Sequence, residues 1–386
     1  MPVDTLTLTA DRVLRPDGSL RPGAVSVAGG QIIALAEEAP ADAVYLPGIL
    51  APGFVDLQLN GGIGIDLGAT DVNSFQRVLA RQPAAGVTSV LATFVSCPIE
   101  RLFAAFDVAR QVTSRPADVG ARLVGVHVEG PFLAPAWRGA HEPSFLRAPD
   151  RRLIADLVEG CGDLFAIMTL APELPAADEC ISALVDAGVV AAIGHSGADA
   201  ATAEHAADLG ARLVTHLFNA QIGLHHRRPG IVGQALTDPR LTVSIIADLE
   251  HVAPVAVRLA FRCKPGGVAL ITDAVAAAGL APGRHTMPDG EVVVVEGEPP
   301  RRPDGTLAGS GLSLDQAVRN AVAVGVPVAD ALLAASTVPA TVLGRTDIGQ
   351  IAPGAHADLV WLDADLRPIQ VWIAGTLILP NGRLPY

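Results

Sequence analysis

The chain has 386 residues, half of them hydrophobic, and a formal net charge of −13. This length suits one large domain with a smaller companion. The acidic balance, without a long basic run, argues against nucleic-acid binding, which needs clustered lysine and arginine. Apolar segments are broken well before the roughly 18 residues that a membrane-spanning helix needs, so we expect no membrane insertion. No basic segment followed by an apolar run opens the sequence, so we expect no secretory signal.

The four cysteines, Cys97, Cys161, Cys180 and Cys263, lie far apart and form no Cys-x-x-Cys pair. This spacing argues against a structural zinc site and against a disulfide framework. Reduced thiols and a cytoplasmic location are therefore expected.

Both ends of the chain predict strands of one small domain. Residues 1–50 contain short β segments separated by turn signals such as Pro16-Asp17-Gly18, and similar segments return within 358–379. We expect a small β-sandwich domain built from residues 1–50 and 345–386, because chain termini often lie together.

The middle of the chain, 51–344, alternates short apolar segments with alanine-rich amphipathic ones, which is typical of βα units around a parallel sheet. Strands are predicted at 53–59, 87–94, 122–128, 165–170, 189–194, 212–216, 242–247 and 268–272. Helices are predicted at 71–84, 98–111, 176–187, 198–209 and 252–262, with a helical pair near 313–337. The sequence therefore predicts an α/β fold with a TIM-like (β/α)8 barrel. Segment 279–308, rich in glycine and proline, predicts a β-hairpin insertion or a mobile loop.

Four ionisable residues follow predicted strand ends, where barrels of this kind carry their chemistry: Glu129, His195, His216 and Asp273. One carboxylate and two neutral imidazoles suit Zn²⁺ or a similar ion and leave a position open for water. A bound metal lowers the pKa of that water toward about 7. Asp273 would then take the proton of the water and pass it to a leaving group.

Each of these residues also has a purely structural interpretation. Glu129 and Asp273 can cap a helix or a loop, and His195 and His216 can be strand-end histidines bonded to their neighbours. Their joint placement favours a shared site, because four ionisable groups buried without partners would be costly. The basic run at 225–228 is either a solvated loop or an anion clamp.

Several motifs, in order and at fitting intervals, resemble one enzyme family. They are Pro-Gly-Phe-Val-Asp (52–56), His-Val-Glu-Gly-Pro (127–131), Gly-Ala-His (139–141), Leu-Ala-Pro-Glu (170–173), Gly-His-Ser (194–196), Thr-His-Leu-Phe-Asn-Ala (215–220), Arg-x-Pro-Gly (227–230), Thr-Asp-Ala (272–274) and Leu-Ala-Gly-Ser (307–310). From about residue 48 to its end, the chain is similar to the N-acetylglucosamine-6-phosphate deacetylases of the amidohydrolase superfamily.

The resemblance implies hydrolysis of the acetamide of N-acetylglucosamine 6-phosphate to glucosamine 6-phosphate and acetate by metal-bound hydroxide. It makes Glu129, His195 and His216 the ligands of one divalent metal ion per subunit and Asp273 the general base and acid. Zinc is the first choice, with iron, cobalt and manganese as alternatives.

The resemblance also assigns contacts to a small amino-sugar phosphate. His141 would polarise the acetyl carbonyl, and a closing loop would carry Leu307. The phosphate pair would be completed by the adjacent subunit, which implies a homodimer. The residues that match substrate contacts are His141, Asn219, Ala220, Arg227, His251 and Leu307.

Two departures from the family pattern bear on the substrate. Gln221-Ile222 stand where the family usually has Met-Pro, and Leu249-Glu250 replace a glycine and an apolar residue before His251. Leucine resists a backbone conformation that glycine tolerates, and Glu250 would repel a phosphate if it pointed inward. N-acetylgalactosamine 6-phosphate, an unphosphorylated N-acyl compound, and a catalytically retired sugar-phosphate binding protein therefore stay open as alternatives.

The first barrel strand places Asp56, Gln58 and Asn60 on one face. Gln58 and Asn60 occupy the positions where many amidohydrolases have a His-x-His pair that binds a second metal. Amide oxygens are weak ligands, whereas amide groups hydrogen-bond readily to water or to a ligand. We therefore predict one tightly held metal on the Glu129 side, with both amides as hydrogen-bonding groups around the vacant position. The alternative is that they only satisfy polar groups at the barrel mouth.

Overall fold

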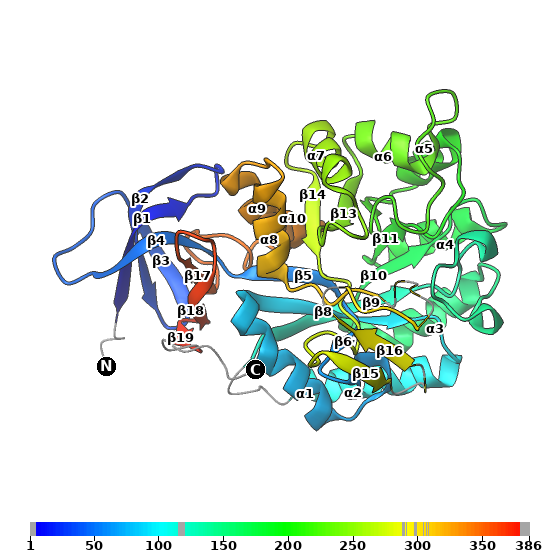
Figure 1. The fold of residues 1–386 in the computed structure, drawn as a ribbon, viewed down its shortest axis with the longest axis horizontal. Coiled ribbons are helices and arrows are strands. Elements are labelled where there is room, and N and C mark those ends of the chain that lie inside the picture. Colours follow the sequence, from blue (N-terminus) through cyan, green and yellow to red (C-terminus); the bar gives the residue numbers. More distant parts are fainter. Residues whose placement is uncertain are drawn as a thin grey trace.

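The computed structural model describes residues 5–114, 120–287, 290, 292–296, 299–303, 305, 307 and 309–378. Within these residues a small sheet domain lies beside a larger barrel of strands surrounded by helices (Figure 1). No helix of the described residues is long and apolar enough to cross a membrane.

Eight parallel strands of the described residues form the barrel. In spatial order they are β5 (Phe54–Leu59), β8 (Val87–Val95), β9 (Arg122–Glu129), β10 (Phe165–Leu170), β11 (Val190–Ile193), β12 (Leu213–Val214), β13 (Thr242–Ile246) and β14 (Val268–Ile271). Each strand overlaps a predicted range, so the barrel prediction is confirmed.

The barrel closes between its first and last strands, which are joined near their carboxyl ends. Asp273 N donates to Gln58 O at 2.9 Å, and Asn60 N donates to Ala274 O at 2.9 Å. Asp56 lies at the same seam and accepts from Thr272 Oγ1 at 2.5 Å. Asp56 Oδ1 also accepts from the backbone N–H groups of Gln58 and Thr272. Burial raises the pKa of Asp56 to about 6.

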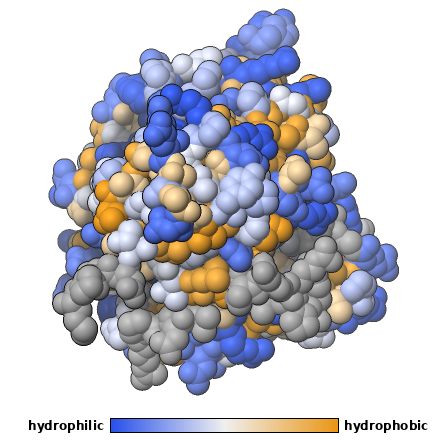
Figure 2. Space-filling view, turned by 90° about the vertical axis from the view of Figure 1, so that its left-hand side faces the viewer, coloured by the Kyte–Doolittle hydropathy of each residue, from blue (hydrophilic) through white to orange (hydrophobic). Residues whose placement is uncertain are grey.

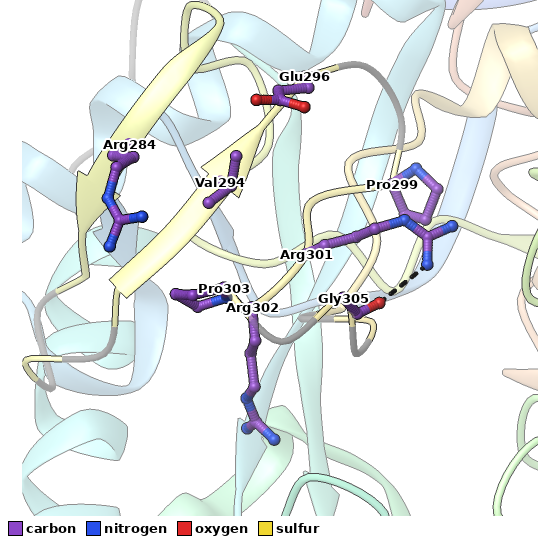
Figure 3. Close-up of a pocket in the computed structure, with 8 residues that line it drawn as sticks. All are labelled: Arg284, Val294, Glu296, Pro299, Arg301, Arg302, Pro303 and Gly305. Carbon is purple, nitrogen blue, oxygen red and sulfur yellow. Dashed lines mark hydrogen bonds between the residues drawn. The ribbon is translucent and has the colours of Figure 1, made fainter.

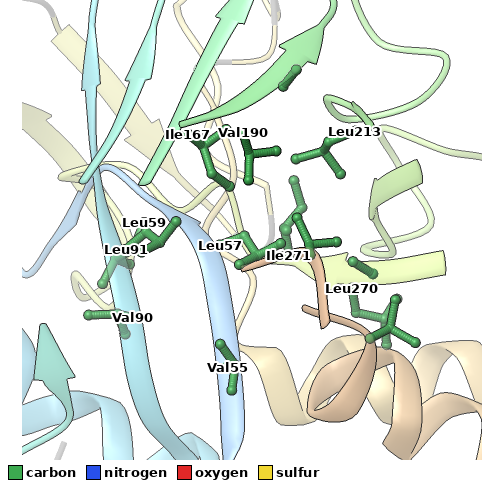
Figure 4. Close-up of a cluster of buried hydrophobic side chains, with 14 of the residues drawn as sticks. Val55, Leu57, Leu59, Val90, Leu91, Ile167, Val190, Leu213, Leu270 and Ile271 are labelled. Carbon is green, nitrogen blue, oxygen red and sulfur yellow. The ribbon is translucent and has the colours of Figure 1, made fainter. Parts of the chain in front are cut away.

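The main hydrophobic core lies along the barrel strands (Figure 4). On β5, apolar residues alternate with the polar residues Asp56 and Gln58. The side chains of Val55, Leu57 and Leu59 are all buried, at 1% exposure or less. They belong to one cluster with side chains from the seven other barrel strands, among them Val90, Ile167, Val190, Leu213 and Ile271. Burial on both faces explains the continuous apolar runs of other barrel strands, such as β11 and β14.

The predicted helices are present as α1 (Val72–Arg81), α2 (Ile99–Ser114), α4 (Ala177–Asp186), α5 (Ala200–Asp208), α7 (Pro254–Cys263), α8 (Leu314–Ala323) and α9 (Val328–Ala335). Aspartate side chains cap the first turns of α1 and α5, because Asp71 and Asp199 accept from backbone N–H groups three residues on. Three further helices of the described residues, α3 (Arg151–Cys161), α6 (Gly230–Thr237) and α10 (Thr337–Val342), were not among the predicted ranges.

Strands from both ends of the chain form a separate sheet domain. Within the described residues its strands form one hydrogen-bonded sheet in the order β19-β18-β17-β4-β1-β2-β3. Their bounds are β1 (Leu6–Leu14), β2 (Leu20–Ala28), β3 (Gln31–Ala36), β4 (Val44–Pro52), β17 (Leu359–Leu362), β18 (Pro368–Ile373) and β19 (Thr376–Leu377). The sheet has a core of its own, which includes Leu8, Val25 and Trp372. Figure 2 views this end of the molecule, where hydrophobic patches lie among hydrophilic residues.

The segment predicted as an insertion contains a β-hairpin, which confirms that alternative. Strand β15 (Gly283–Thr286) pairs antiparallel with β16 (Val292–Val295). Arg301 then exchanges two backbone hydrogen bonds with Val294, at 2.7 and 3.0 Å. A second small ladder, β6 (Gly61–Gly62) with β7 (Ile65–Asp66), follows the first barrel strand.

The only lysine of the sequence, Lys264, is buried just after α7. Its Nζ donates to Asp238 O at 2.5 Å, and burial lowers the pKa of its ammonium group. The carboxylate of Asp238 is in turn bound by Arg240.

Candidate metal centre

The four predicted ionisable residues stand at equivalent places on four strands. Glu129 is the last residue of β9, and His195, His216 and Asp273 each lie two residues beyond the ends of β11, β12 and β14. The latter three have positive backbone φ angles of 49°, 31° and 49°. Residues other than glycine rarely adopt this conformation, and such strain is concentrated at functional sites. The same backbone turn thus follows three different strands.

Three of these side chains converge on one point. Glu129 Oε1 lies 3.0 Å from His195 Nε2 and 2.9 Å from His216 Nε2, and the two Nε2 atoms lie 3.1 Å apart. Ligand atoms arranged tetrahedrally around zinc lie about 3.4 Å from one another when each is about 2.1 Å from the metal. The three side chains are buried. Their spacing therefore fits a single divalent ion.

The hydrogen bond on the far side of His195 supports this fit. Its Nδ1 donates to Trp137 O at 2.9 Å, so Nε2 presents a lone pair to Glu129 and His216. Electron-pair donors this close need a cation or a proton between them. His216 Nδ1 has no hydrogen-bond partner in the described part of the chain, while His216 N donates to Ser244 Oγ at 2.8 Å.

The buried carboxylate of Glu129 is held in its charged form. Burial alone would raise its pKa, but the electrostatic influence of the adjacent His195 and His216 outweighs burial and holds the pKa well below its usual range. An anionic carboxylate beside neutral imidazoles is the donor set expected of a zinc site.

His141 lies at the edge of this cluster. Its ring packs edge-on against that of His195 with centroids 4.7 Å apart, and its Nε2 lies 3.9 Å from Glu129 Oε2. Glu129, His141 and His195 also have ligand atoms within 4.8 Å of one another. The set that contains His216 is tighter, so we take His216 rather than His141 as the third ligand. Burial lowers the pKa of His141 to about 4, which keeps the ring neutral at pH 7.

Asp273 is bound by the two amides of the first strand. Its Oδ1 accepts from Gln58 Nε2 at 3.0 Å and from Asn60 Nδ2 at 2.7 Å. Among the described residues, Oδ2 has no hydrogen-bond partner. Burial first, and then the charge of Glu129, raise the pKa of Asp273 to about 6. A carboxylate with one oxygen fixed and one free is suited to proton transfer near neutral pH.

Comparison with known proteins decides the family. Residues 49–378 match the amidohydrolase family model. The chain belongs to the amidohydrolase family. It is 41% identical over 339 residues to the N-acetylglucosamine-6-phosphate deacetylase of Danio rerio, over 85% of this chain and 83% of that protein. It is 36% identical to the N-acetylgalactosamine-6-phosphate deacetylase of Escherichia coli O157:H7, over 97% and 99% of the two chains.

Solved structures agree with the family assignment. N-acetyl-D-glucosamine-6-phosphate deacetylase from Mycobacterium smegmatis, solved in complex with N-acetyl-D-glucosamine-6-phosphate, matches this amidohydrolase with a TM-score of 0.90 and 36% identity. The match covers 98% of this chain and 100% of that one. The predicted fold and the resemblance to these deacetylases are thereby confirmed.

The turn after β12 carries two predicted substrate contacts, Asn219 and Ala220. Asn219 N donates to His216 O at 2.9 Å, and Ala220 has a positive φ of 49°. Gln221, where this amidohydrolase departs from the family pattern, braces the same turn. Its Nε2 donates to Thr215 O at 2.8 Å, and its Oε1 accepts from Phe218 N at 3.2 Å.

The second departure does not place a free carboxylate beside His251. Glu250 Oε2 pairs with Arg301 Nη2 of the hairpin insertion at 3.0 Å. His251 Nδ1 lies 2.5 Å from Asp248 Oδ2, and Leu249 takes a positive φ of 70°. Leu249 thus adopts a conformation that leucine was expected to resist, and the negative charge of Glu250 is offset by an ion pair.

The remaining predicted contacts lie apart from the ligand cluster. Arg227 is exposed, and its Nη1 lies 3.0 Å from His226 Nε2. Leu307 forms an isolated β-bridge with Arg301. Within the described residues of one subunit, no contact joins Arg227 or Leu307 to Glu129.

A cavity of about 420 Å³ lies in the hairpin insertion (Figure 3). It is lined by three arginines, Arg284, Arg301 and Arg302, with Glu296. Their guanidinium groups lie apart and do not converge on one point. The cavity therefore lacks the convergent donors of an anion site, and it is separate from the ligand cluster.

Sequence reasoning gave no role to Glu173 and Ser96, which support the cluster. Glu173 accepts from Ser196 Oγ at 2.7 Å and from Gly197 N at 2.6 Å, which fixes the turn after His195. Ser96 Oγ lies 2.9 Å from His141 Nδ1. Ser96 directly follows β8 and Glu173 follows β10 by three residues, so the strand-end rule that found Glu129 could have found both.

Proposed function

We propose that this amidohydrolase hydrolyses the acetamide of N-acetylglucosamine 6-phosphate to glucosamine 6-phosphate and acetate. The observation that carries the proposal is the placement of Asp273 and the cluster of Glu129, His195 and His216 at the ends of barrel strands. The relatives at about 41% identity and the sugar-phosphate complex of the M. smegmatis relative support the choice of substrate.

Glu129, His195 and His216 would hold one divalent ion per subunit. Zinc is the first choice for one carboxylate and two imidazoles, and iron, cobalt or manganese can share this set. The ion supplies activation of the attacking water and polarisation of the acetyl carbonyl. Gln58 and Asn60 bind Asp273, so they act as hydrogen-bonding groups rather than as ligands of a second metal.

Asp273 moves the proton. Its free Oδ2 takes a proton from the attacking water as the new C–O bond forms. The same oxygen then delivers that proton to the leaving nitrogen as the C–N bond breaks, since an amine anion would not leave unassisted. Nε2 of His141 donates a hydrogen bond to the acetyl oxygen while negative charge develops on it.

Asn219, Ala220 and Leu307 would contact the sugar, and Arg227 with His251 would bind the phosphate. Because Arg227 is exposed and lies apart from the ligand cluster, it would serve the site of an adjacent subunit in a homodimer. The four free cysteines support a cytoplasmic location. The domain division at 1–50 with 345–386 and at 51–344 is part of the same proposal.

N-acetylgalactosamine 6-phosphate is the second candidate substrate. The E. coli relative named for it matches nearly the full length of both chains. A retired binding protein is disfavoured, because the ligand cluster and the free oxygen of Asp273 are both present.

Acetate release tests the proposal. Zinc-loaded protein is given N-acetylglucosamine 6-phosphate, N-acetylgalactosamine 6-phosphate and unphosphorylated N-acetylglucosamine. We expect the highest kcat/KM with the first and a loss of about 100-fold or more without the phosphate. Faster turnover of N-acetylgalactosamine 6-phosphate would make that compound the preferred substrate. Equal rates with and without the phosphate would refute the assignment of Arg227 and His251 as the phosphate-binding pair. Removal of the metal by a chelator should abolish turnover, and zinc should restore it.

A further inference from the structure

Ser96 lies where two strand ends meet. It follows β8 directly, is 7% exposed, and has two hydrogen-bond partners. Its Oγ lies 2.9 Å from His141 Nδ1 and 3.5 Å from Glu129 O. The first distance is typical of a good hydrogen bond and the second is at the outer limit. The hydroxyl proton is therefore assigned to the bond with His141.

This assignment fixes the proton on the imidazole ring. A neutral imidazole carries one N–H, so a ring that accepts at Nδ1 carries its proton at Nε2. His141 Nε2 faces the cluster, 3.9 Å from Glu129 Oε2. The ring then presents a hydrogen-bond donor to the place where the acetyl oxygen would develop negative charge.

The backbone of His141 is also held. Its N–H donates to Arg138 O at 3.1 Å, and its carbonyl accepts from Arg138 Nη1 at 2.7 Å. These bonds fix the main chain but leave rotation of the ring free. Contact with His195 and the bond to Ser96 Oγ are the interactions that restrict the ring.

We propose that Ser96 is a positioning residue of the hydrolytic site, whose hydroxyl donates to His141 Nδ1 and holds the Nε2–H toward the acetyl oxygen of the substrate. The inference rests on the proposed function for the role of His141. Ser96 does not touch substrate or metal, and it acts through His141.

Kinetics give the first test. In Ser96→Ala, kcat should fall about 10-fold with KM changed less than about twofold, because the donor is lost mainly in the transition state. Ser96→Thr keeps the hydroxyl and should restore kcat to within about threefold of the unaltered enzyme. Thr93→Val is the matched control, because Thr93 Oγ1 lies buried on the same strand without a partner among the described residues. An unchanged kcat in Ser96→Ala, or equal losses in Ser96→Ala and Thr93→Val, would overturn the proposal.

A double-mutant cycle separates His141 from the other acceptor. If Ser96 acts through His141, Ser96→Ala should cost less than about twofold in a His141→Ala background. If it acts through Glu129 O instead, the full loss should recur in that background, and the proposal is wrong.

Nitrogen NMR of zinc-loaded protein labelled with ¹⁵N-histidine tests the hydrogen bond without any substrate. The His141 signals, assigned by their loss in His141→Ala, should show a protonated Nε2 and an unprotonated, hydrogen-bonded Nδ1. Ser96→Ala should shift the Nδ1 signal, and Thr93→Val should not. A protonated Nδ1 in the unaltered protein would overturn the proposal. An enzyme inactive on every N-acetyl sugar would refute the proposed function, and the NMR result would still decide the Ser96 bond.

Discussion

Gln58 and Asn60 donate to one oxygen of Asp273, and this pairing bears on when the carboxylate is charged. Burial raises the pKa of Asp273 to about 6, while the bond from Asn60 opposes burial by stabilising the anion. The amides that stand where other amidohydrolases have metal-binding histidines therefore lie beside a proton carrier.

Asn60→Ala should move the acid limb of the pH profile of kcat/KM to higher pH. The lost hydrogen bond stabilised the carboxylate, so its removal raises the pKa of Asp273, by about half to one unit. The base must be deprotonated to act, so activity should appear at higher pH than in the unaltered enzyme. Profiles of both proteins with the same metal check this, with the exposed Asn73→Ala as control. A limb that stays in place, or moves to lower pH, would contradict the assigned contact.

Asp273→Asn should fold, retain its metal and lose turnover by roughly 1,000-fold, because an amide cannot accept the proton of the water. Metal content and acetate release, measured on the same preparation, check both halves of the prediction. Turnover within tenfold of the unaltered enzyme would remove Asp273 from the mechanism.

At the scale of elements, Asp56 and Thr272 join the first strand of the barrel to the last. The folded pKa of Asp56, about 6, lies above the usual value, so the folded state binds the proton more tightly than the unfolded chain. Its contribution to stability is therefore largest below pH about 4 and falls as the pH rises to about 6.

Asp56→Asn should make stability less dependent on pH. Asparagine can accept both backbone N–H bonds and donate to Thr272 Oγ1, whose own proton can go to Gln58 O, 3.2 Å away. Relative to the unaltered protein, the variant should gain roughly 2–3 kcal/mol in free energy of unfolding between pH 4 and 7. Urea unfolding at the two pH values measures the difference. If the two proteins differ in free energy of unfolding by the same amount at both pH values, Asp56 does not change its charge in this range.

The sequence predicts the barrel well, because strands buried on both faces carry short apolar runs such as 268–271. It predicts helix α6 poorly, since that helix begins at Gly230 and contains Gly233, which has low helical propensity. The site shows the same contrast. The strand-end residues Glu129 and His195 can be read locally, whereas the pairing of Glu250 with Arg301 spans 51 positions and depends on how the hairpin folds back.

For the whole molecule, the exposure of Arg227 predicts that one subunit completes the phosphate site of another. Light scattering should give a mass twice the 39.6 kDa of the chain. Arg227→Ala and Asp273→Asn should each be nearly inactive at low substrate concentration. Co-refolded or co-expressed in equal amounts, they should recover about a quarter of the normal activity, because half of the dimers are mixed and each has one intact site. A mixture no more active than its parents would place Arg227 in its own subunit's site or outside any site.

The burial of Lys264 leaves arginine and histidine as the cationic side chains of the surface. Guanidinium groups keep their charge above pH 12, so alkaline conditions that neutralise lysine-rich surfaces would change this one little. Reagents that acylate lysine would find their one side-chain target enclosed and bonded to Asp238 O. A lysine introduced at a chosen exposed position would therefore be a nearly unique attachment point for a label or a solid support.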